Sequence, residues 1–348
     1  MSTPVLEQFK QHHGTFTTMA VKVKALLEDL LKHSQIKYHF IEARAKTVES
    51  FSDKVNRPGK NYRDPIKEIS DLVGARVILY YSDDVIRCGT LIQKEFQVIE
   101  IENSHQQSEF QADQFGYLSM HYIVTLAKRR GKLVEWRDYS DIQCEIQVRT
   151  VLQHSWAAIS HALQYKREGD VPRDLRRKLY RLAGIFELAD EEFLELRDLA
   201  TQKLKETKLA LAKGLDDDIK IDTASINELA ASWKYVSEQL EKLSKLGINT
   251  EPEEDLGDDK FDYAGEIVEQ CERLKISSIA ELKKLVQYDA SQYFKNIAEE
   301  GWGMGNIFVL YLLLIGARPK EFTADSLATD GWHKDIAARV INGAQKAK

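Results

Sequence analysis

The fold is decided by one stretch of sequence, Asp141-Ile142-Gln143-Cys144-Glu145-Ile146-Gln147-Val148-Arg149-Thr150, in which apolar and polar residues alternate. A period of two residues is that of a β-strand with one buried face. The apolar side chains are predicted to point into a core: Ile142, Cys144, Ile146 and Val148. The polar side chains then project from the opposite face: Gln143, Glu145, Gln147 and Arg149. A carboxylate, an amide and a guanidinium in one row can bind metal, accept a proton and hold phosphate. We therefore expect this polar face to form part of the functional site.

The bulk composition is that of a soluble globular protein with two domains. The chain has 348 residues, 43% of them hydrophobic and 30% charged, which suffices for ordinary packed cores. A net charge of −6 and a pI near 5.9 argue against a chain that coats nucleic acid by bulk electrostatics, but they do not exclude a local basic patch. The three cysteines, Cys88, Cys144 and Cys271, lie far apart without a CxxC pair. This spacing argues against zinc and disulfides and for a reducing cytoplasm.

Neither the N-terminus nor the longest apolar run of the sequence fits an export or membrane signal. Met1–Lys10 lacks the basic start and apolar run of a signal peptide. The longest apolar run, Ile307–Ile315, is about half as long as a membrane span. We therefore predict a buried core helix for that run, a cytoplasmic location for the chain, and no membrane partner.

Periods of 3.6 and of 2 residues divide the first part of the chain into elements. Helical periodicity covers residues 5–33, 48–55, 64–72, 85–95, 150–165 and 173–211, with a turn signal at Asn56-Arg57-Pro58-Gly59. Strand patterns cover residues 75–81, 96–102, 116–126 and 141–150. Interleaved strands and helices, with some strands adjacent, predict an α+β fold in which a mixed β-sheet is flanked by helices.

The composition changes at Gly214-Leu215-Asp216-Asp217-Asp218, and the chain beyond is almost wholly helical. We therefore predict two domains, residues 1–214 and an all-α C-terminal region over residues 219–348. Two Ser-x-x-Glu patterns predict that Ser225 and Ser278 are the N-caps of two helices. Three aromatic residues of this region are candidates to anchor an interface with a partner: Tyr293, Trp302 and Trp332.

Three further groups of residues carry side chains that suit nucleotide chemistry. One set could hold a polyphosphate or form a solvated basic face: Arg44, Lys46, Ser50 and Lys54. Asp83-Asp84 follows a buried strand, where carboxylates either hold metal or form a turn. Residues 116–121 place an aromatic ring, a hydroxyl and an imidazole on one face of a predicted strand. The aromatic ring could stack on a nucleobase, or it could pack at the rim of the domain. Each group alone leaves both interpretations open.

Taken in order, five motifs resemble the RelA/SpoT-type synthetase domain. Their patterns are R-x-K-x-x-x-S-x-x-x-K, G-x-R with a hydrophobic run and D-D, G-Y-x-S-x-H, E-x-Q-x-R-T, and W-A-x-x-x-H-x-L-x-Y-K. In this sequence they read Arg44 to Lys54, Gly74 to Asp84, Gly116 to His121, Glu145 to Thr150, and Trp156 to Lys166. The resemblance spans residues 37–181 and implies a nucleotidyltransferase-like synthetase domain.

The family transfers the β,γ-pyrophosphate of ATP to a ribose 3′-hydroxyl, usually of GDP or GTP, and so makes the alarmone (p)ppGpp of the stringent response. The resemblance implies that Arg44 lies against the adenine of ATP, with further residues near the phosphates: Lys46, Ser50, Lys54 and Arg76. It implies Mg²⁺ as the cofactor, held by Asp84 and Glu145, and Glu145 would also help to deprotonate the attacking hydroxyl. Tyr117 would stack on the acceptor base. The rest of the acceptor and phosphate environment would be shaped by His121, Gln147 and Arg149.

The sequence departs from the family pattern at two positions. Phe115 stands where many members have Asn before the Gly-Tyr pair, and Ser160 stands where small synthetases have Glu before His161. Both departures lie on the acceptor side, so the acceptor is less specified than the donor. No His-Asp dipeptide occurs, so the metal-dependent hydrolase domain of the bifunctional relatives is not expected.

Two other functions remain open. Toxin-type relatives pyrophosphorylate the 3′-terminal adenosine of tRNA, and such an enzyme needs a basic surface near its pocket. Two groups of cations are candidates, with ordinary solvated charge as the plain alternative: Lys128, Arg129, Arg130, Lys132 and Arg137, and Lys166, Arg167, Arg173, Arg176, Arg177, Lys178 and Arg181. The other function is that of a non-catalytic nucleotide sensor, which the retention of both Asp84 and Glu145 disfavours.

The C-terminal region has several candidate roles. In a toxin-type enzyme of phage defence it would neutralise the catalytic domain until a protein trigger acts on it. In other enzymes such a region regulates activity, or it serves as a structural or oligomerisation module of a homo-oligomer. The sequence leaves these roles open.

Overall fold

The computed structural model describes residues 3–103, 119–162, 173–250, 262–298 and 303–347. The chain groups into two compact units, Met1–Asp198 and Leu199–Lys348, each with a hydrophobic core of its own. The division lies inside helix α7 (Arg173–Ala212). The boundary suggested by composition, between residues 214 and 219, follows the end of that helix and stays a prediction.

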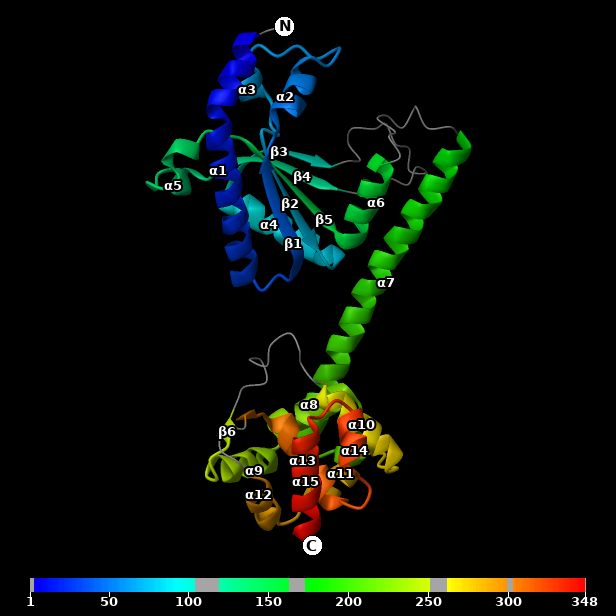
Figure 1. Ribbon diagram of the computed structural model, residues 1–348. Helices are drawn as coiled ribbons and strands as arrows, with labels where there is room; N and C mark the ends of the chain where they lie inside the picture. The colour runs from blue at the N-terminus through cyan, green and yellow to red at the C-terminus, as the bar shows by residue number, and fades with distance from the viewer. Residues whose placement is uncertain (1–2, 104–118, 163–172, 251–261, 299–302, 348) are drawn as a thin grey trace. The chain divides into compact units, whose positions relative to one another are not determined.

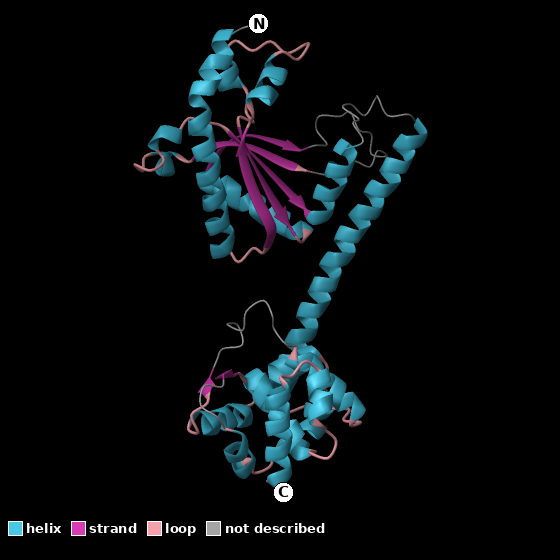
Figure 2. Ribbon diagram, viewed as in Figure 1, coloured by secondary structure: helices cyan, strands magenta, loops and turns pink. Residues whose placement is uncertain are grey.

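The first unit is built on a mixed sheet flanked by helices, as the sequence predicted, but the sheet has five strands and β1 was not among the predicted ones (Figure 2). The strand order is β1-β2-β5-β4-β3, in which β2 and β5 are parallel and every other neighbouring pair is antiparallel. The strands are β1 (Tyr38–Ala45), β2 (Val73–Leu79), β3 (Phe96–Asn103), β4 (Met120–Leu126) and β5 (Cys144–Thr150).

One face of the sheet is apolar and is covered by two helices, α1 (Thr3–His33) and α4 (Ser82–Glu95) (Figure 1). Cys144, Ile146 and Val148 of β5 have no exposed surface, which confirms the predicted core face. The core side of α1 repeats at helical spacing and includes Phe9, Phe16, Met19, Val23, Leu27 and Leu31. Burial of this face leaves the other face of the sheet for polar side chains.

The opposite face is partly covered by α6 (Val151–Ala162), which follows directly on β5. The His154 ring lies edge-on to Phe40 of β1, with ring centroids 5.5 Å apart. Thr150, at the end of β5, donates a hydrogen bond of 2.7 Å from Oγ1 to the buried Asp190 of α7. These contacts fix α6 and the adjoining part of α7 at the end of the sheet where β2 and β5 finish.

Short elements complete the first unit: α2 (Val48–Val55), α3 (Pro65–Glu68), α5 (Lys128–Gly131) and the 3₁₀ turn Arg137–Tyr139. The helix predicted over residues 64–72 was too long, because α3 ends at Glu68. Ile69 and Leu72 are both 2% exposed and lead into β2 in extended or irregular conformation. Burial of these two side chains therefore overrides the helical pattern of the local sequence.

The second unit is a helical domain around α13 (Asn306–Ala317), whose residues 309–315 have no exposed surface. This confirms the buried core helix predicted there. The remaining helices are α8 (Thr223–Ser232), α9 (Lys234–Ser244), α10 (Tyr263–Arg273), α11 (Ile279–Val286), α12 (Ser291–Ile297), α14 (Ala324–Thr329) and α15 (Lys334–Lys346), with a 3₁₀ turn at Asp216–Asp218. The region is not purely helical, because β6 (Asn249–Thr250) pairs with β7 (Gly303–Met304).

Two expectations for this unit were wrong. Tyr293 and Trp332 are 2% and 7% exposed, so they pack inside the domain and do not anchor an interface; Trp302 lies outside the described residues. The cap of α8 is Asp222, with Ser225 as the third helical residue of its capping box. The cap of α11 is Ser278 as predicted, since its hydroxyl accepts from the N–H of Glu281.

Three cysteines are buried and free: Cys88 in α4, Cys144 in β5 and Cys271 in α10. Burial raises the pKa of Cys88 and of Cys271 to about 12 and that of Cys144 further still. Among the helices that the structure describes, none is both long and apolar enough to cross a membrane.

Candidate functional site

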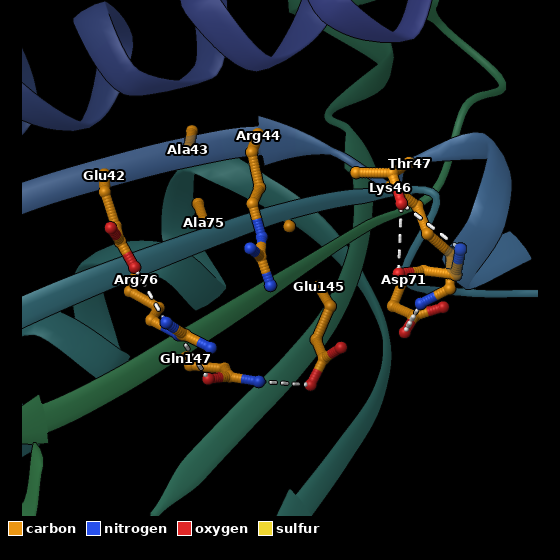
Figure 3. Close-up of a pocket in the computed structure, with 12 residues that line it drawn as sticks. Glu42, Ala43, Arg44, Lys46, Thr47, Asp71, Ala75, Arg76, Glu145 and Gln147 are labelled. Atoms are coloured by element: carbon orange, nitrogen blue, oxygen red, sulfur yellow. Dashed lines mark hydrogen bonds and ion pairs between the residues drawn. The ribbon is translucent and has the colours of Figure 1, made fainter. Parts of the chain in front are cut away.

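The open face of the sheet carries a pocket of about 220 Å³ (Figure 3). Strand register builds it, because Gly74 pairs with Arg44 on one side and with Glu145 on the other. Two residues along, Arg76 pairs with Glu42 and Gln147 in the same way. The pocket is lined by Glu42, Ala43, Arg44, Lys46, Thr47, Ser50, Asp71, Gly74, Ala75, Arg76, Glu145 and Gln147.

Helix α2 brings further polar groups to this pocket. Its N-cap Thr47 accepts the backbone N–H of Ser50 at 3.2 Å, which sets the direction of the helix. Phe51, 1% exposed, stacks on Phe9 of α1 with centroids 4.0 Å apart and holds the helix against the core. Ser50 lines the pocket and Lys54, one turn later, reaches Asp71.

Asp71, which the sequence analysis did not single out, joins two lysines. Its Oδ2 accepts from Lys46 Nζ at 2.6 Å and its Oδ1 accepts from Lys54 Nζ at 2.9 Å. Burial alone would raise the pKa of Asp71, but the two ammonium groups lower it below its usual value. The carboxylate is therefore ionised at neutral pH and both of its oxygens bind a lysine.

A chain of hydrogen bonds crosses the strands. Arg76 pairs with Glu42 at 2.8 Å and donates from Nε to Oε1 of Gln147 at 3.2 Å. Gln147 in turn donates from Nε2 to Oε1 of Glu145 at 2.9 Å. Because the amide oxygen faces a guanidinium and the amide nitrogen faces a carboxylate, the orientation of Gln147 is fixed.

His121 completes the surroundings of Glu145. Its Nδ1 lies 2.9 Å from Oε1 of Glu145, and Nη2 of Arg149 lies 3.3 Å from its Nε2. An arginine only donates, so Nε2 must accept and the ring proton sits on Nδ1, aimed at the carboxylate. Burial would raise the pKa of Glu145, but the bonds from His121 and Gln147 lower it.

Arg149 lies deep on the same face. Burial, together with the charge of Arg76, lowers its pKa to about 10, so it stays a cation at neutral pH. It also donates to the hydroxyl of Ser119. Arg149 thus orients His121, and through it Glu145.

Gly74 forms part of the pocket wall between Arg44 and Glu145. A Cβ atom at this position would meet no other atom within 4 Å. The space that a side chain would take is therefore pocket space, and a glycine keeps it available for a ligand.

Most of the predicted site residues come together here. Arg44, Lys46, Ser50, Arg76, Glu145 and Gln147 line the pocket, Lys54 contacts Asp71, and His121 and Arg149 connect to Glu145 by hydrogen bonds. Tyr117 lies outside the described residues.

Asp84 is the exception and requires a correction. Glu145 is level with Gly74 at the start of β2, whereas Asp84 follows the other end of that strand, in the first turn of α4. The strand between Gly74 and Leu79 alone spans roughly 16 Å. Asp84 is 5% exposed and pairs with Arg87 at 2.6 Å. The structure therefore does not bring Asp84 and Glu145 together, and Asp71 is the carboxylate that lies near Glu145.

Asp71 and Glu145 are the groups that could hold a metal. Both carboxylates line the same pocket, and the negative charge of Asp71 opposes the lowering of the pKa of Glu145. Among the described residues there is no cluster of three His, Cys, Asp or Glu side chains suited to a metal ion. A pair of carboxylates fits Mg²⁺, which keeps several waters and completes its shell with substrate phosphates, and does not fit a closed protein cage.

The basic groups considered for tRNA lie elsewhere or lie partly outside the described residues. None of the first five cations lines the pocket, and Arg130 pairs with Glu95 at 3.2 Å. Of the second group, Lys166 and Arg167 lie outside the described residues. The side chains of Arg173 and Arg176 are also outside the described part of the chain, and none of the described cations of this group lines the pocket.

Known proteins resemble the part of the chain that contains this pocket: all of the lining residues except Glu42 lie within the region matched by a family model. Residues 43–170 match the family model described as the region found in RelA / SpoT proteins. GTP pyrophosphokinase YjbM of Bacillus subtilis (strain 168) is 28% identical over 185 residues, which cover 50% of this chain and 78% of that protein. GTP pyrophosphokinase YwaC of the same organism is 25% identical over 171 residues, which cover 48% and 77% respectively. The chain is homologous to both.

Two solved structures of similar proteins each cover more than half of the chain. A GTP pyrophosphokinase family protein from Streptococcus pneumoniae superposes with a TM-score of 0.46 at 26% identity, over 58% of this chain and 97% of that one. Small alarmone synthetase 1 from Bacillus subtilis superposes with a TM-score of 0.45 at 24% identity, over 56% and 99%.

Proposed function

Residues 43–170 belong to the RelA/SpoT family, and on this basis we propose that the chain is a pyrophosphokinase that moves the β,γ-pyrophosphate of ATP to the 3′-hydroxyl of GDP or GTP. The proposal is supported by two homologues, YjbM and YwaC, which are both named GTP pyrophosphokinases. The observation that carries the proposal is the pocket at Gly74, which joins cations on β1 and β2 to the carboxylates Asp71 and Glu145.

The donor side is proposed to be the end of the pocket next to α2. A triphosphate needs several positive charges within reach, because pyrophosphoryl transfer depends on positioning and charge neutralisation. The pocket supplies two ammonium groups and two guanidinium groups: Lys46, Lys54, Arg44 and Arg76. The hydroxyl of Ser50 adds a neutral hydrogen-bonding group for the same phosphates.

Mg²⁺ is proposed as the cofactor, held by Asp71 and Glu145 together with phosphate oxygens and water. Once bound, the ion neutralises the charge that develops on the transferred phosphates. Glu145 suits this role because its lowered pKa keeps it ionised at neutral pH. Its Oε1 is oriented by His121 and Gln147, at 2.9 Å each.

The acceptor is proposed to lie on the side of His121, Gln147 and Arg149. In the reaction the 3′-oxygen attacks the β-phosphorus of ATP and the bond from that phosphorus to the α-phosphate oxygen breaks, so AMP leaves. The proton of the attacking hydroxyl passes to a carboxylate oxygen of Glu145. A nucleotide is the proposed acceptor because Arg149, with a pKa of about 10, offers a half-buried cation to its phosphates.

The proposal is tested by incubating the purified chain with ATP labelled at the β-phosphate, Mg²⁺, and GDP, GTP or tRNA in separate reactions. The labelled product is separated by thin-layer chromatography or by gel. Label on GDP or GTP supports the proposal, and label on tRNA alone would assign the toxin-type activity instead. Absence of label on every acceptor, with ATP still bound, would leave the chain a nucleotide sensor. Glu145→Gln should lose at least about a hundredfold in rate, whereas Asp84→Asn should retain turnover because Asp84 lies away from the pocket.

A further inference from the structure

The cations of the pocket are matched by carboxylates of the same pocket. Lys46 and Lys54 each bond one oxygen of Asp71, at 2.6 and 2.9 Å, and Arg76 bonds Glu42 at 2.8 Å. A cation that already donates to a carboxylate must give up that charge-assisted bond before it can bind a phosphate with the same hydrogens. Binding of a polyphosphate therefore competes with these internal ion pairs.

We propose that Asp71 is a positioning residue, which withholds Lys46 and Lys54 from phosphate until a divalent cation occupies its carboxylate. This inference rests on the proposed function, because it concerns the nucleotide and metal sites of the same pocket. Both oxygens of Asp71 carry a lysine in the ligand-free chain, so a metal ion at either oxygen meets an ammonium group. Like charges repel at this range, and the metal displaces the lysines toward the phosphates.

Replacement of the two lysines by a metal ion at Asp71 couples metal binding to nucleotide binding. Asp71 is well shielded, with a side chain 23% exposed, and its partner Lys46 is only 15% exposed, so their bond is not weakened by full solvation. Without metal, each phosphate contact made by Lys46 or Lys54 removes a partner from this carboxylate. With metal, the carboxylate is neutralised and the lysines are free. By linkage, the factor by which metal strengthens nucleotide binding equals the factor by which nucleotide strengthens metal binding.

The decisive variant is Asp71→Asn, which keeps the size of the side chain and removes its charge. Binding of α,β-methylene-ATP, whose α–β link does not transfer, is measured by isothermal titration calorimetry in EDTA and again in Mg²⁺. In EDTA the variant should bind the analogue about tenfold more tightly than the wild type, because the lysines no longer have a charged competitor. The increase in affinity on adding Mg²⁺ should be smaller in the variant than in the wild type.

Two further variants control for general electrostatics. Glu49→Gln removes an exposed negative charge on α2 that pairs with neither lysine, and it should change affinity in EDTA by no more than about twofold. Glu42→Gln frees Arg76 without touching Asp71, so it should strengthen binding about equally with and without metal. Circular dichroism and thermal unfolding check each fold, and Asp71→Ser replaces Asp71→Asn if the latter does not fold.

The possible results are distinct. Tighter binding to the Asp71 variant in EDTA, together with little change for Glu49→Gln, supports the proposal. Unchanged or weaker binding to the Asp71 variant in EDTA overturns it, as does an equal gain for Glu49→Gln. A wild-type chain that binds no analogue even with Mg²⁺ contradicts the proposed function itself, so the two failures are told apart.

Discussion

At the scale of single residues, the position that controls access to the pocket is Gly74. A Cβ atom there meets nothing within 4 Å, so the protein itself tolerates a side chain. Gly74→Val should therefore fold with a free energy of unfolding within about 1 kcal/mol of the wild type, because β-branched residues suit a strand. Its branched side chain should fill pocket space beside Glu145 and weaken ATP binding by about tenfold or more. Urea unfolding and calorimetric titration measure the two quantities.

The contrary result for Gly74→Val is equally clear. Unaltered nucleotide affinity in a folded variant would mean that the ligand does not approach this wall. A matched control is Gly59→Ala in the turn after α2, which lies away from the pocket and has φ +82°. That control should lose stability through backbone strain and keep its nucleotide affinity.

Asp71 also makes stability depend on pH. Its pKa is lowered in the folded chain, so its contribution is fully present above the unfolded value of about 3.9 and is lost as the pH falls through the lower folded value. The difference in unfolding free energy between the wild type and Asp71→Asn should be about 1 to 3 kcal/mol at pH 7 and should shrink as the pH falls below about 4. Urea unfolding at several pH values measures it; a pH-independent difference would contradict the ion-pair explanation.

The choice between Asp71 and Asp84 shows what the sequence could and could not predict at this scale. Both aspartates flank the same strand, β2, one before it and one after it. Which of them lies near Glu145 depends on the parallel register of β2 and β5, in which Gly74 pairs with Glu145. That register is a long-range property, so no local pattern around either aspartate contains it. The alternation of buried and polar residues along β5, by contrast, follows from a local period of two, and the apolar face of this strand was predicted correctly.

At the scale of elements, the strongly periodic segments were predictable and their ends less so. The helix at 48–55 was predicted at its observed bounds, because Thr47 caps it and the turn at Asn56 follows it. The helix predicted over residues 64–72 was too long, because the burial of Ile69 and Leu72 in the core cannot be recognised from the local sequence pattern. The predicted N-cap of α8, Ser225, lies three residues after the observed N-cap, Asp222. Both residues can cap a helix, and Asp222 also forms a long-range ion pair with Lys203 at 2.7 Å, which the local pattern does not contain.

The packing of α4 on β4 leads to a prediction for Gly89. A Cβ atom there would overlap the hydroxyl of Tyr122, which is 3% exposed, and lie 3.0 Å from its Cζ. Glycine to alanine inside a helix ordinarily gains up to about 1 kcal/mol. Here overpacking should outweigh that gain, and Gly89→Ala should destabilise the chain by about 1 to 2 kcal/mol.

The companion variant Tyr122→Phe tests the cause. It removes the overlapping hydroxyl, so Gly89→Ala should cost markedly less in that background than in the wild type. Chemical unfolding of the two single variants and the double variant gives the coupling free energy. Additive effects would mean that the Tyr122 hydroxyl is not what limits space at Gly89.

At the scale of the whole molecule, each of the two units has its own core, which is what independent folding requires. A chain ending at Leu215 should therefore fold. If the C-terminal unit restrains the enzyme, as in a toxin-type architecture, the shortened chain should inhibit growth more strongly on induced expression than the full chain. Equal growth with a folded product would contradict restraint, and the Glu145→Gln version of the shortened chain is the inactive control.

The buried cysteines of both units have a practical consequence for labelling. A thiol whose pKa is raised to about 12 stays protonated at neutral pH and reacts slowly with maleimides. A cysteine introduced at the exposed Asp53 of α2 should then be the site that takes a fluorophore or spin label, with the native thiols left in place. Movements of α2 on nucleotide binding could be followed spectroscopically in an otherwise unaltered chain.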